Sequence, residues 1–334
     1  GGDTLYDSSE HSQDSVDGTI NGANWVENIY GCTDELACNY NPEANWDDDS
    51  CDYSCHDNGD YSLSFDGVDD YVDLGVDIFD NINTGSIDLE FEGLDGIFNQ
   101  HIFNFEDIII LKVENNELVL VFYDSYMGTG NNFQRIFASF DYGWNSLRIT
   151  WNETQGQLLI NNSVVGEISF ESQNSPDFTY FNRENIIGSR YSTDGNFFNG
   201  SINNLLVSNI DETHRYAIYK FNAGDGTTLY DHSGNGNHGN IYSAQWAGCT
   251  DPLADNYLPN AEVDDGSCTG SSVNTEDFTY AGELDGHYYY FSNYDSNWET
   301  SKLSCEENSG HLVTIKDEAE NSYIANIIAE YLDD

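Results

Sequence analysis

Oxygen-bearing side chains recur at every second position in one glycine-rich stretch of the sequence. They belong to Asp231, Ser233, Asn235 and Asn237, and glycines lie among them. Glycine lets the backbone turn tightly, so the loop can fold these oxygens around a hard cation, and Ca²⁺ takes roughly six to eight oxygen ligands in flexible loops. The pattern predicts a Ca²⁺ site; the alternative is a polar turn that needs no metal. A glycine-poor counterpart fits Ca²⁺ less well and comprises Asp7, Ser9, His11 and Gln13.

Acidic residues also crowd two loops that are bounded by cysteines. The stretch 31–51 is repeated as 248–268, and the bounding cysteines are equally spaced in both copies. Several carboxylates in one short loop repel one another unless a cation or backbone N–H groups compensate. We therefore expect either Ca²⁺ in these loops or Asp side chains that cap backbone turns. The residues concerned are Asp34, Asp47, Asp48 and Asp49 in the first loop, and Asp251, Asp264 and Asp265 in the second.

The repeat also predicts how the cysteines pair. Four cysteines in the first copy allow three pairings, but the second copy keeps only Cys249 and Cys268, the counterparts of Cys32 and Cys51. The expected disulfides are therefore Cys32–Cys51, Cys38–Cys55 and Cys249–Cys268, with Cys305 left over. Closing a loop of this size would stabilise the fold by about 3 kcal/mol. Oxidised pairs indicate an extracellular or otherwise oxidising compartment.

The repeat extends upstream of the cysteines. The segment from Leu5 matches the segment from Leu229, Gly18 matches Gly239, and Trp25 matches Trp246. The offset between the copies is as long as a domain, so the chain is a modular array.

Composition limits the classes of partner. The 334 residues include 60 acidic and only 9 basic ones, for a formal net charge of −51. Such a field repels nucleic acid and anionic lipid, so we expect neither as a partner, and cations are favoured. The longest apolar runs, 108–111 and 118–122, are strand-length, far below the roughly 18 to 20 residues of a membrane span. We expect no membrane insertion. No signal peptide opens the sequence, so we expect a piece of a longer protein.

From residue 61 to about residue 209 the pattern is that of an all-β domain. Residues 86–92 alternate apolar and acidic side chains, as expected for a strand with one buried face. Two β-rich runs meet at Asn115-Asn116, a credible hairpin turn because Asn tolerates positive φ. Many short strands with Gly and Asn turns predict an antiparallel jelly-roll sandwich. The further expected strands are 107–114, 117–123, 144–151, 157–160, 164–170 and 201–208.

Three segments of this region resemble the laminin-G-like, concanavalin-A-like jelly-roll family: 62–72, 144–151 and 198–202. The resemblance implies two curved antiparallel sheets, often a bound Ca²⁺, and binding of a glycan or a protein. In many members a segment similar to 231–239 opens the domain. Residues 1–27 are therefore expected either to supply strands to this jelly roll or to close another domain. The cysteine loops resemble Gly-Cys-Thr-Asp repeats of secreted proteins.

The C-terminal segment is partly helical. Asp317 and Glu320 form a capping box, and Ile324, Ile327, Ile328 and Tyr331 fall on one helical face. Segments 288–291, 298–305 and 310–315 resemble the N-terminal third of a C-type lectin domain, whose sugar-binding and Ca²⁺-binding loops lie further on. The resemblance implies that Cys305 bonds a cysteine near the end of such a domain.

Signals for catalysis are weak, and we expect a protein that is not an enzyme. Asp88, Glu90 and Glu92 resemble the carboxylate strand of jelly-roll glycoside hydrolases, which place an acid and a nucleophile about 5 Å apart. Their order departs from the usual Glu-led motif, however, and alternation alone predicts a solvated face. The eight histidines are scattered, without a metal-like cluster, and no nucleophile elbow or phosphate-binding loop occurs. Sequons mark three candidate glycosylation sites, Asn152, Asn161 and Asn199.

These observations predict a mainly β protein: an antiparallel jelly-roll sandwich with small disulfide-stapled loops and a partial α+β C-terminal domain. The expected divisions are a repeat segment at 1–30, a stapled acidic loop at 31–57, the jelly roll at 58–212, a repeat segment at 213–247, a second stapled loop at 248–269, and the lectin-like part at 270–334. The expected function is Ca²⁺-dependent adhesion outside the cell to a glycan or a surface protein. The alternative is a structural subunit of an extracellular filament or sheath built from copies of the chain.

Overall fold

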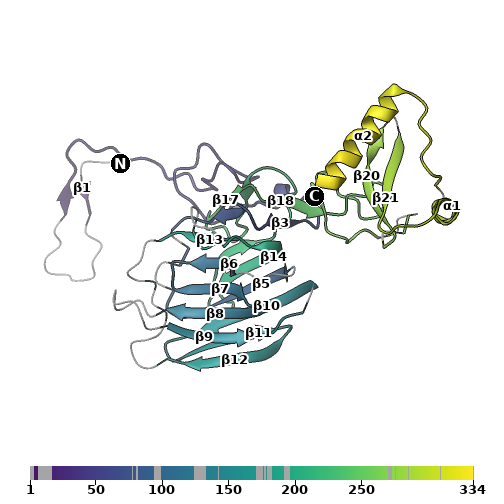
Figure 1. Cartoon of the computed structure of the whole chain (residues 1–334). Helices are drawn as coiled ribbons and strands as arrows, with labels where there is room; N and C mark the ends of the chain where they lie inside the picture. Colours follow the sequence, from purple (N-terminus) through teal and green to yellow (C-terminus); the bar gives the residue numbers. More distant parts are fainter. Residues whose placement is uncertain are drawn as a thin grey trace. The chain divides into compact units, whose positions relative to one another are not determined.

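The computed structural model describes residues 4–6, 17–76, 78–79, 82–93, 99–123, 133–141, 143–170, 176, 178, 183–191, 196–269, 273–274, 276–284, 286–308 and 310–333. The early counterpart of the 231–237 loop, Asp7, Ser9, His11 and Gln13, lies outside these residues. The chain divides into two compact units, residues 1–53 and residues 54–334. The second unit contains the jelly roll (Figure 1).

The jelly roll consists of two sheets, which have nine and eight strands within the described residues. The nine-stranded sheet contains β3 (Ser62–Asp66), β5 (Gly85–Gly93), β10 (Gly143–Trp151), β11 (Gln155–Ile160), β12 (Ser163–Ser169), β14 (Asn199–Ser208), β15 (Arg215–Tyr219), β18 (Gln245–Gly248) and β19 (Val263–Asp264). The eight-stranded sheet contains β4 (Tyr71–Asp73), β6 (Gln100–Phe105), β7 (Ile109–Glu114), β8 (Glu117–Tyr123), β9 (Phe133–Ala138), β13 (Asn185–Ile187), β16 (Thr228–Leu229) and β17 (Gly239–Tyr242). Neighbouring strands are antiparallel, apart from the short parallel pair β18–β19. The predicted fold class is confirmed.

Alternating side chains of both sheets meet in one core. In β5, Ile87, Leu89 and Phe91 are at most 2% exposed, while the acidic residues between them lie on the outer face. Phe103 and Leu111 of the other sheet belong to the same apolar cluster. Each such side chain contributes about 1.5 to 3 kcal/mol on burial, so the period-two pattern of the sequence fixes which face of each strand turns inward.

The hairpin predicted at Asn115-Asn116 connects β7 and β8. Both residues have positive φ, 55° and 63°, as a two-residue turn of this kind requires. Asn161 and Asn162 adopt the same conformation, with φ of 49° and 63°, between β11 and β12. Because Asn tolerates the left-handed region better than most residues, these two Asn pairs set the register of their hairpins.

Residues 213–247, expected as a separate repeat segment, are part of the jelly roll. They supply β15–β17 and most of β18, of which β17 pairs with β4 and β18 with β3. Leu229 and Trp246 are 1% and 3% exposed in the core. The jelly roll thus extends beyond the expected boundary at residue 212. Every described strand of its two sheets comes from the second unit, and none comes from residues 1–30.

The first unit repeats the local structure of residues 213–247. Its strands β1 (Thr4–Leu5) and β2 (Gly18–Thr19) pair Leu5 with Gly18, as β16 and β17 pair Leu229 with Gly239. Downstream, Asn45 N–H donates to the Ile29 carbonyl, and Glu262 N–H donates to the Trp246 carbonyl. Ile29, rather than Trp25, therefore occupies the position of Trp246, because four additional residues precede Gly31.

Disulfides close both acidic loops. The structure contains Cys32–Cys51 and Cys249–Cys268, the pairs that the repeat predicts. Cys38 and Cys55 are also disulfide-bonded, and Cys305 is free. Cys55 lies in the short 3-10 helix η1 (Ser54–His56).

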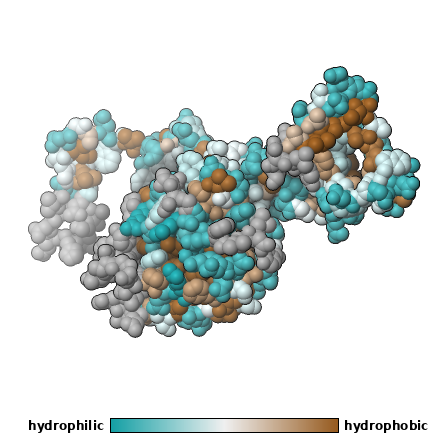
Figure 2. Space-filling view, in the orientation of Figure 1, coloured by the Kyte–Doolittle hydropathy of each residue, from teal (hydrophilic) through white to brown (hydrophobic). Residues whose placement is uncertain are grey.

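The C-terminal part pairs two strands with two helices: β20 (Phe278–Leu284), β21 (His287–Ser292), α1 (Trp298–Glu307) and α2 (Glu318–Asp333). As the capping box predicts, Asp317 Oδ1 accepts from Glu320 N–H at 2.9 Å, but Glu320 Oε2 accepts from Lys316 N–H. The side chain of Tyr331 lies outside the described residues. No residue of α1 is buried, and Figure 2 shows apolar side chains gathered on the surface around α2. This part therefore buries little apolar surface.

Candidate functional site

A cleft of about 750 Å³ lies over the outer face of the nine-stranded sheet. Its floor comes from β3, β5, β10 and β14, and one wall comes from the second cysteine loop. A volume of this size suits a small ligand. The lining residues are Asp60, Tyr61, Ser62, Glu90, Trp144, Asn145, Ser146, Asn161, Asn203, Asn256, Tyr257, Leu258, Asp265 and Ser267.

Sheet register places a polar row across the floor. Glu90 of β5 pairs with Ser146 of β10 on one side and with Asn203 of β14 on the other. Ser62 of β3 directly precedes Leu63, which pairs with Ile202 of β14. Cross-strand neighbours on one face lie roughly 5 Å apart, so these four side chains form a continuous polar strip from residues far apart in the sequence.

The wall is held against the sheet by backbone bonds and one apolar anchor. Glu262 N–H donates to the Trp246 carbonyl at 2.8 Å, and Leu258 N–H donates to the Cys249 carbonyl at 2.9 Å. The Leu258 side chain packs on the jelly-roll core. A Cβ added to Gly248 would lie 2.6 Å from Leu258 Cδ1, so a larger residue there would force the Leu258 side chain to shift.

Two exposed aromatic side chains flank the cleft. Trp144 is 43% exposed and Tyr257 is 39% exposed. Trp144 lies on the solvent side of β10, where its neighbours Asn145, Leu147 and Ile149 point inward and are buried. A tryptophan at an outward position of an alternating strand is a signal that sequence reasoning could have used. Aromatic faces in an open cleft suit ligands with flat apolar surfaces and polar edges.

Most amides around the cleft are occupied in holding its walls. Asn145 Nδ2 donates to the carbonyls of Asp141 and Gly143, both at 2.8 Å. Asn256 Nδ2 donates to the Ser267 carbonyl at 2.8 Å, and its Oδ1 accepts from Thr269. Asn203 Oδ1 and Ser62 Oγ, in contrast, are buried without a hydrogen-bond partner. Buried polar atoms are normally paired, so these two atoms at the floor of the cleft are exceptions.

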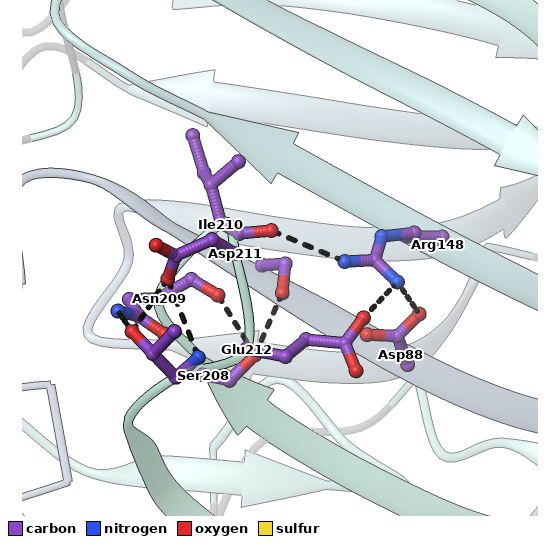
Figure 3. Close-up of polar contacts among 9 residues, drawn as sticks. Asp88, Arg148, Ser208, Asn209, Ile210, Asp211 and Glu212 are labelled. Atoms are coloured by element: carbon purple, nitrogen blue, oxygen red, sulfur yellow. Dashed lines mark hydrogen bonds and ion pairs between the residues drawn. The ribbon is translucent and has the colours of Figure 1, made fainter.

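The three acidic residues of β5, Asp88, Glu90 and Glu92, lie in three different environments. Glu90 lies in the cleft, while burial and then the neighbouring Asp265 carboxylate raise the pKa of Glu92. Asp88 lies 3.3 Å from Arg148, which also binds Glu212 at 2.6 Å, as Figure 3 shows. Burial raises the pKa of Asp88, and the Arg148 charge opposes that shift. Asp88 is thus committed to an ion pair, and only Glu90 of the three lines the cleft.

The structure brings Asp231, Ser233, Asn235 and Asn237 together, but through hydrogen bonds. Asp231 is fully buried and accepts from the backbone N–H groups of Ile218, Ser233 and Asn237. The side-chain nitrogens of Asn235 and Asn237 both donate to the Tyr216 carbonyl, at 2.9 and 3.0 Å. As arranged, these amide nitrogens are engaged by a backbone carbonyl. Calcium there stays a prediction.

The loop carboxylates cap backbone turns. Asp47 accepts from Thr33 and Asp49, Asp48 accepts from Ser50 N–H, and the pKa of Asp47 is lowered chiefly by its bond from the Thr33 side chain. In the second loop, Asp264 accepts from Thr250 and from Gly266 N–H, and Asp265 accepts from Ser267 N–H. These bonds are those that the turn-capping alternative requires, and Asp49 has positive φ, 59°, within its turn. Calcium in these loops stays a prediction.

Asp34 and Asp251 have a second role in common. Each caps its own loop by accepting from the backbone N–H two residues later, Leu36 in one copy and Leu253 in the other. Each also accepts a hydrogen bond of 2.7 Å from a tyrosine hydroxyl, Tyr53 for Asp34 and Tyr290 for Asp251. Burial and then the Asp251 carboxylate raise the pKa of Tyr290. The repeated Asp therefore ties each loop to the chain that follows it.

Sequence reasoning missed one group of carboxylates. Within the described residues, Asp66, Asp69 and Asp70 are the acidic group whose oxygens all lie within 4.8 Å of one another. Asp70 accepts from Asp66 N–H and is 3% exposed, and burial raises its pKa to about 6. These residues stand in the turn between β3 and β4, in the segment singled out for its jelly-roll resemblance. Carboxylate oxygens placed so close together are the kind of donors that a hard cation takes.

The three sequon asparagines lie in different settings. Asn152 Oδ1 accepts from Thr154 and Gln155 and closes the turn before β11. Asn161 is exposed at the cleft edge, where its Oδ1 accepts from Ser146 N–H at 3.0 Å. Asn199 opens β14 and is partly exposed. Glycosylation stays a prediction at all three.

No family model and no curated protein matches the sequence. Among solved structures, a candidate carbohydrate-binding protein of Bacteroides ovatus is similar, with a TM-score of 0.44 and 12% identity over 57% of this chain and 60% of that one. Domains LG4-5 of the mouse laminin alpha1 chain give a TM-score of 0.34 and 14% identity over 52% and 46%. The carbohydrate module CBM40 of the Ruminococcus gnavus IT-sialidase, bound to alpha2,3 sialyllactose, gives 0.35 and 12% over 44% and 90%.

Proposed function

We propose that this chain is a glycan-binding adhesion protein of the cell exterior, whose jelly roll binds sugar in the cleft. The observation that carries the proposal is the combination of exposed Trp144 and Tyr257 with the unpaired buried atoms of Asn203 and Ser62. Sugar rings present apolar faces that stack on aromatic rings and hydroxyls that pair with such polar atoms. The C-terminal part is proposed as the beginning of a lectin-like domain.

An extracellular location follows from the chemistry of the cysteines. Six cysteines are disulfide-bonded, and disulfides persist in oxidising compartments. Among the described residues, no helix combines the length and apolarity that crossing a membrane demands.

The test is binding of the full chain to an oligosaccharide array, followed by calorimetry on the sugars that bind. Trp144→Ala and Tyr257→Ala should each weaken binding about tenfold or more, the effect of losing about 1.4 kcal/mol of contact. Trp25→Ala is the matched control, because Trp25 is an exposed aromatic residue of the first unit. Absence of binding to every sugar, or equal losses in all three variants, would refute the proposal.

The second part of the proposal is that a Ca²⁺ ion stabilises the jelly roll. Its proposed ligands are Asp66, Asp69 and Asp70. Three carboxylates so close together repel one another, and a bound divalent ion would relieve that repulsion. Millimolar CaCl₂ should raise the melting temperature of the chain relative to a chelator. Asp66→Asn should abolish that increase, whereas Asp264→Asn in the cysteine loop should leave it intact. A melting temperature that does not respond to Ca²⁺ would exclude the ion.

The alternative, a subunit of a filament or sheath, is favoured by one observation. Leu5, Ile29 and Tyr30 are 59%, 41% and 59% exposed, although the residues at their positions in the second copy are buried. Exposed apolar residues of this kind often mark interaction sites. Sedimentation at increasing protein concentration decides the matter: a filament subunit polymerises, and a monomeric adhesin does not.

A further inference from the structure

We propose that the cleft selects glycans that present hydroxyl or amino groups and rejects glycans that carry carboxylate or sulfate. This inference rests on the proposed function and names the class of sugar that the same cleft accepts. It is carried by two observations, the charges and the unpaired hydrogen-bonding atoms of the lining.

The charges of the lining are all negative. Asp60, Glu90 and Asp265 contribute carboxylates, and no Lys, Arg or His is among the described residues that line the cleft. The basic residue on the same sheet face, Arg148, is engaged by Asp88 at 3.3 Å and by Glu212 at 2.6 Å (Figure 3). Arg148 therefore cannot turn to an anionic ligand without breaking two ion pairs.

Two acceptor groups of the floor have capacity for further hydrogen bonds. Among the described residues, Asn203 Oδ1 is buried and unpaired, and the Glu90 carboxylate accepts a hydrogen bond from Asn204 Nδ2 at 3.0 Å and can accept more. The amide donors of Asn145 and Asn256 are already used within the walls. These acceptors favour a ligand that brings donors, as hydroxyl and ammonium groups do.

An ionised carboxylate or sulfate offers acceptors only. Placed over this floor, it would face like charges, at a site where the protein partly excludes water and weakens screening. Neutral sugars avoid that repulsion, and amino sugars are attracted by the same carboxylates. We therefore expect the order amino sugar, then neutral sugar, then acidic sugar.

The experiment compares oligosaccharides of equal length by calorimetry on the full chain. The probes are oligomers of glucosamine, of glucose and of galacturonic acid, so that they span positive, neutral and negative charge. We expect the glucosamine and glucose oligomers to bind and the galacturonic acid oligomer to bind at least about tenfold more weakly, a difference of about 1.4 kcal/mol.

Two nearly isosteric variants locate the source of the selectivity. Glu90→Gln and Asp265→Asn should each reduce the difference in binding affinity between the neutral and the acidic oligomer. Glu117→Gln, an exposed residue of β8 away from the cleft, is the matched control and should leave it unchanged. Thermal melting verifies that each variant is folded.

The outcomes separate this inference from the proposed function. Binding of the acidic oligomer as tight as that of the neutral one would overturn the inference and leave glycan binding standing. If Glu90→Gln and Asp265→Asn left the difference in affinity between the neutral and the acidic oligomer unchanged, the inference would also be overturned, because the discrimination would then arise from the net charge of the whole chain. Failure of all oligomers to bind would refute the proposed function itself.

Discussion

Residues of the same type have different roles because their partners differ. Asn145 and Asn256 hold the cleft together through both ends of their amides, whereas Asn203 keeps a buried oxygen unpaired. Asp231 accepts hydrogen bonds from backbone N–H groups, whereas Asp265, together with burial, raises the pKa of Glu92. The chemical meaning of an acidic or amide residue in this chain is therefore set by what surrounds it.

The buried side chain of His101 predicts that the stability of the fold depends on pH. It is 4% exposed in β6, its Nδ1 is unpaired, and burial, followed by the charges of Lys112 and Arg190, lowers its pKa from 6.5 to about 4. Below pH 6.5 the unfolded chain takes up a proton that the folded chain refuses, so stability is lost as the pH falls toward 4. The loss attributable to His101 reaches about 3 kcal/mol.

Urea unfolding between pH 7 and pH 4 measures this loss. The free energy of unfolding of His101→Gln should fall less steeply with decreasing pH than that of the unmodified chain. That of the control variant His287→Gln, which changes an exposed histidine, should fall as steeply as that of the unmodified chain. Equal slopes for all three proteins would contradict the assignment.

At the scale of elements, the two copies of the repeat form the same local structures in different surroundings. β1–β2 and β16–β17 have the same register, and both loops have the same disulfide. Among the described residues, the second copy supplies strands of the jelly roll and lines the cleft. The copies therefore serve as matched controls for each other.

The paired leucines of the two hairpins should respond differently to truncation. Leu229 is 1% exposed, so Leu229→Ala should cost about 2 to 5 kcal/mol, the range for a large apolar side chain lost from a core. Leu5 is 59% exposed, so Leu5→Ala should cost no more than about 0.5 kcal/mol. Chemical unfolding followed by tryptophan fluorescence measures both, and similar losses would contradict the burial pattern.

The paired disulfides provide a second contrast. Replacing Cys249 and Cys268 by Ser should free the wall of the cleft, weaken sugar binding about tenfold, and remove up to about 3 kcal/mol of stability. Replacing Cys32 and Cys51 by Ser should leave sugar binding unchanged, because the described cleft takes no residue from that loop. Calorimetry measures sugar binding, and limited proteolysis reports whether the loop is loosened. Loss of binding in both double variants would contradict the assignment of the second cysteine loop as the wall of the cleft.

For the whole molecule, the dominant property is the net charge of −51. Mutual repulsion of so many carboxylates destabilises the compact state, and salt screens it over a Debye length of about 10 Å at 0.1 M. Stability should therefore depend on ionic strength more than in a protein of balanced charge.

Raising NaCl from about 20 mM to about 500 mM should increase the melting temperature, by roughly 2 to 4 °C for each kcal/mol of repulsion that is screened. Scanning calorimetry measures the increase, and CaCl₂ at equal ionic strength separates screening from specific binding. A melting temperature that stays constant or falls with NaCl would show that the charges are already compensated within the fold.

The sequence by itself determined the strands that it predicted between residues 86 and 208, the Asn115-Asn116 hairpin turn and the disulfides Cys32–Cys51 and Cys249–Cys268. These features depend on local periodicity, on the conformational tolerance of single residues, or on the comparison of two copies of one segment, all of which a linear chain displays. The exposed position of Trp144 was also readable from the alternation of β10.

Only the tertiary structure decided where the candidate site lies. Ser62, Glu90, Ser146 and Asn203 become neighbours through strand register, and Tyr257 reaches them because Leu258 anchors its loop on the core. Likewise, the Asp231 loop has the composition of a cation site, but Tyr216, whose carbonyl its amides bind, comes from the adjoining strand β15. Hydrogen-bond partners that are distant in sequence compete with a ligand for the same polar atoms, and that competition is settled only when the chain has folded.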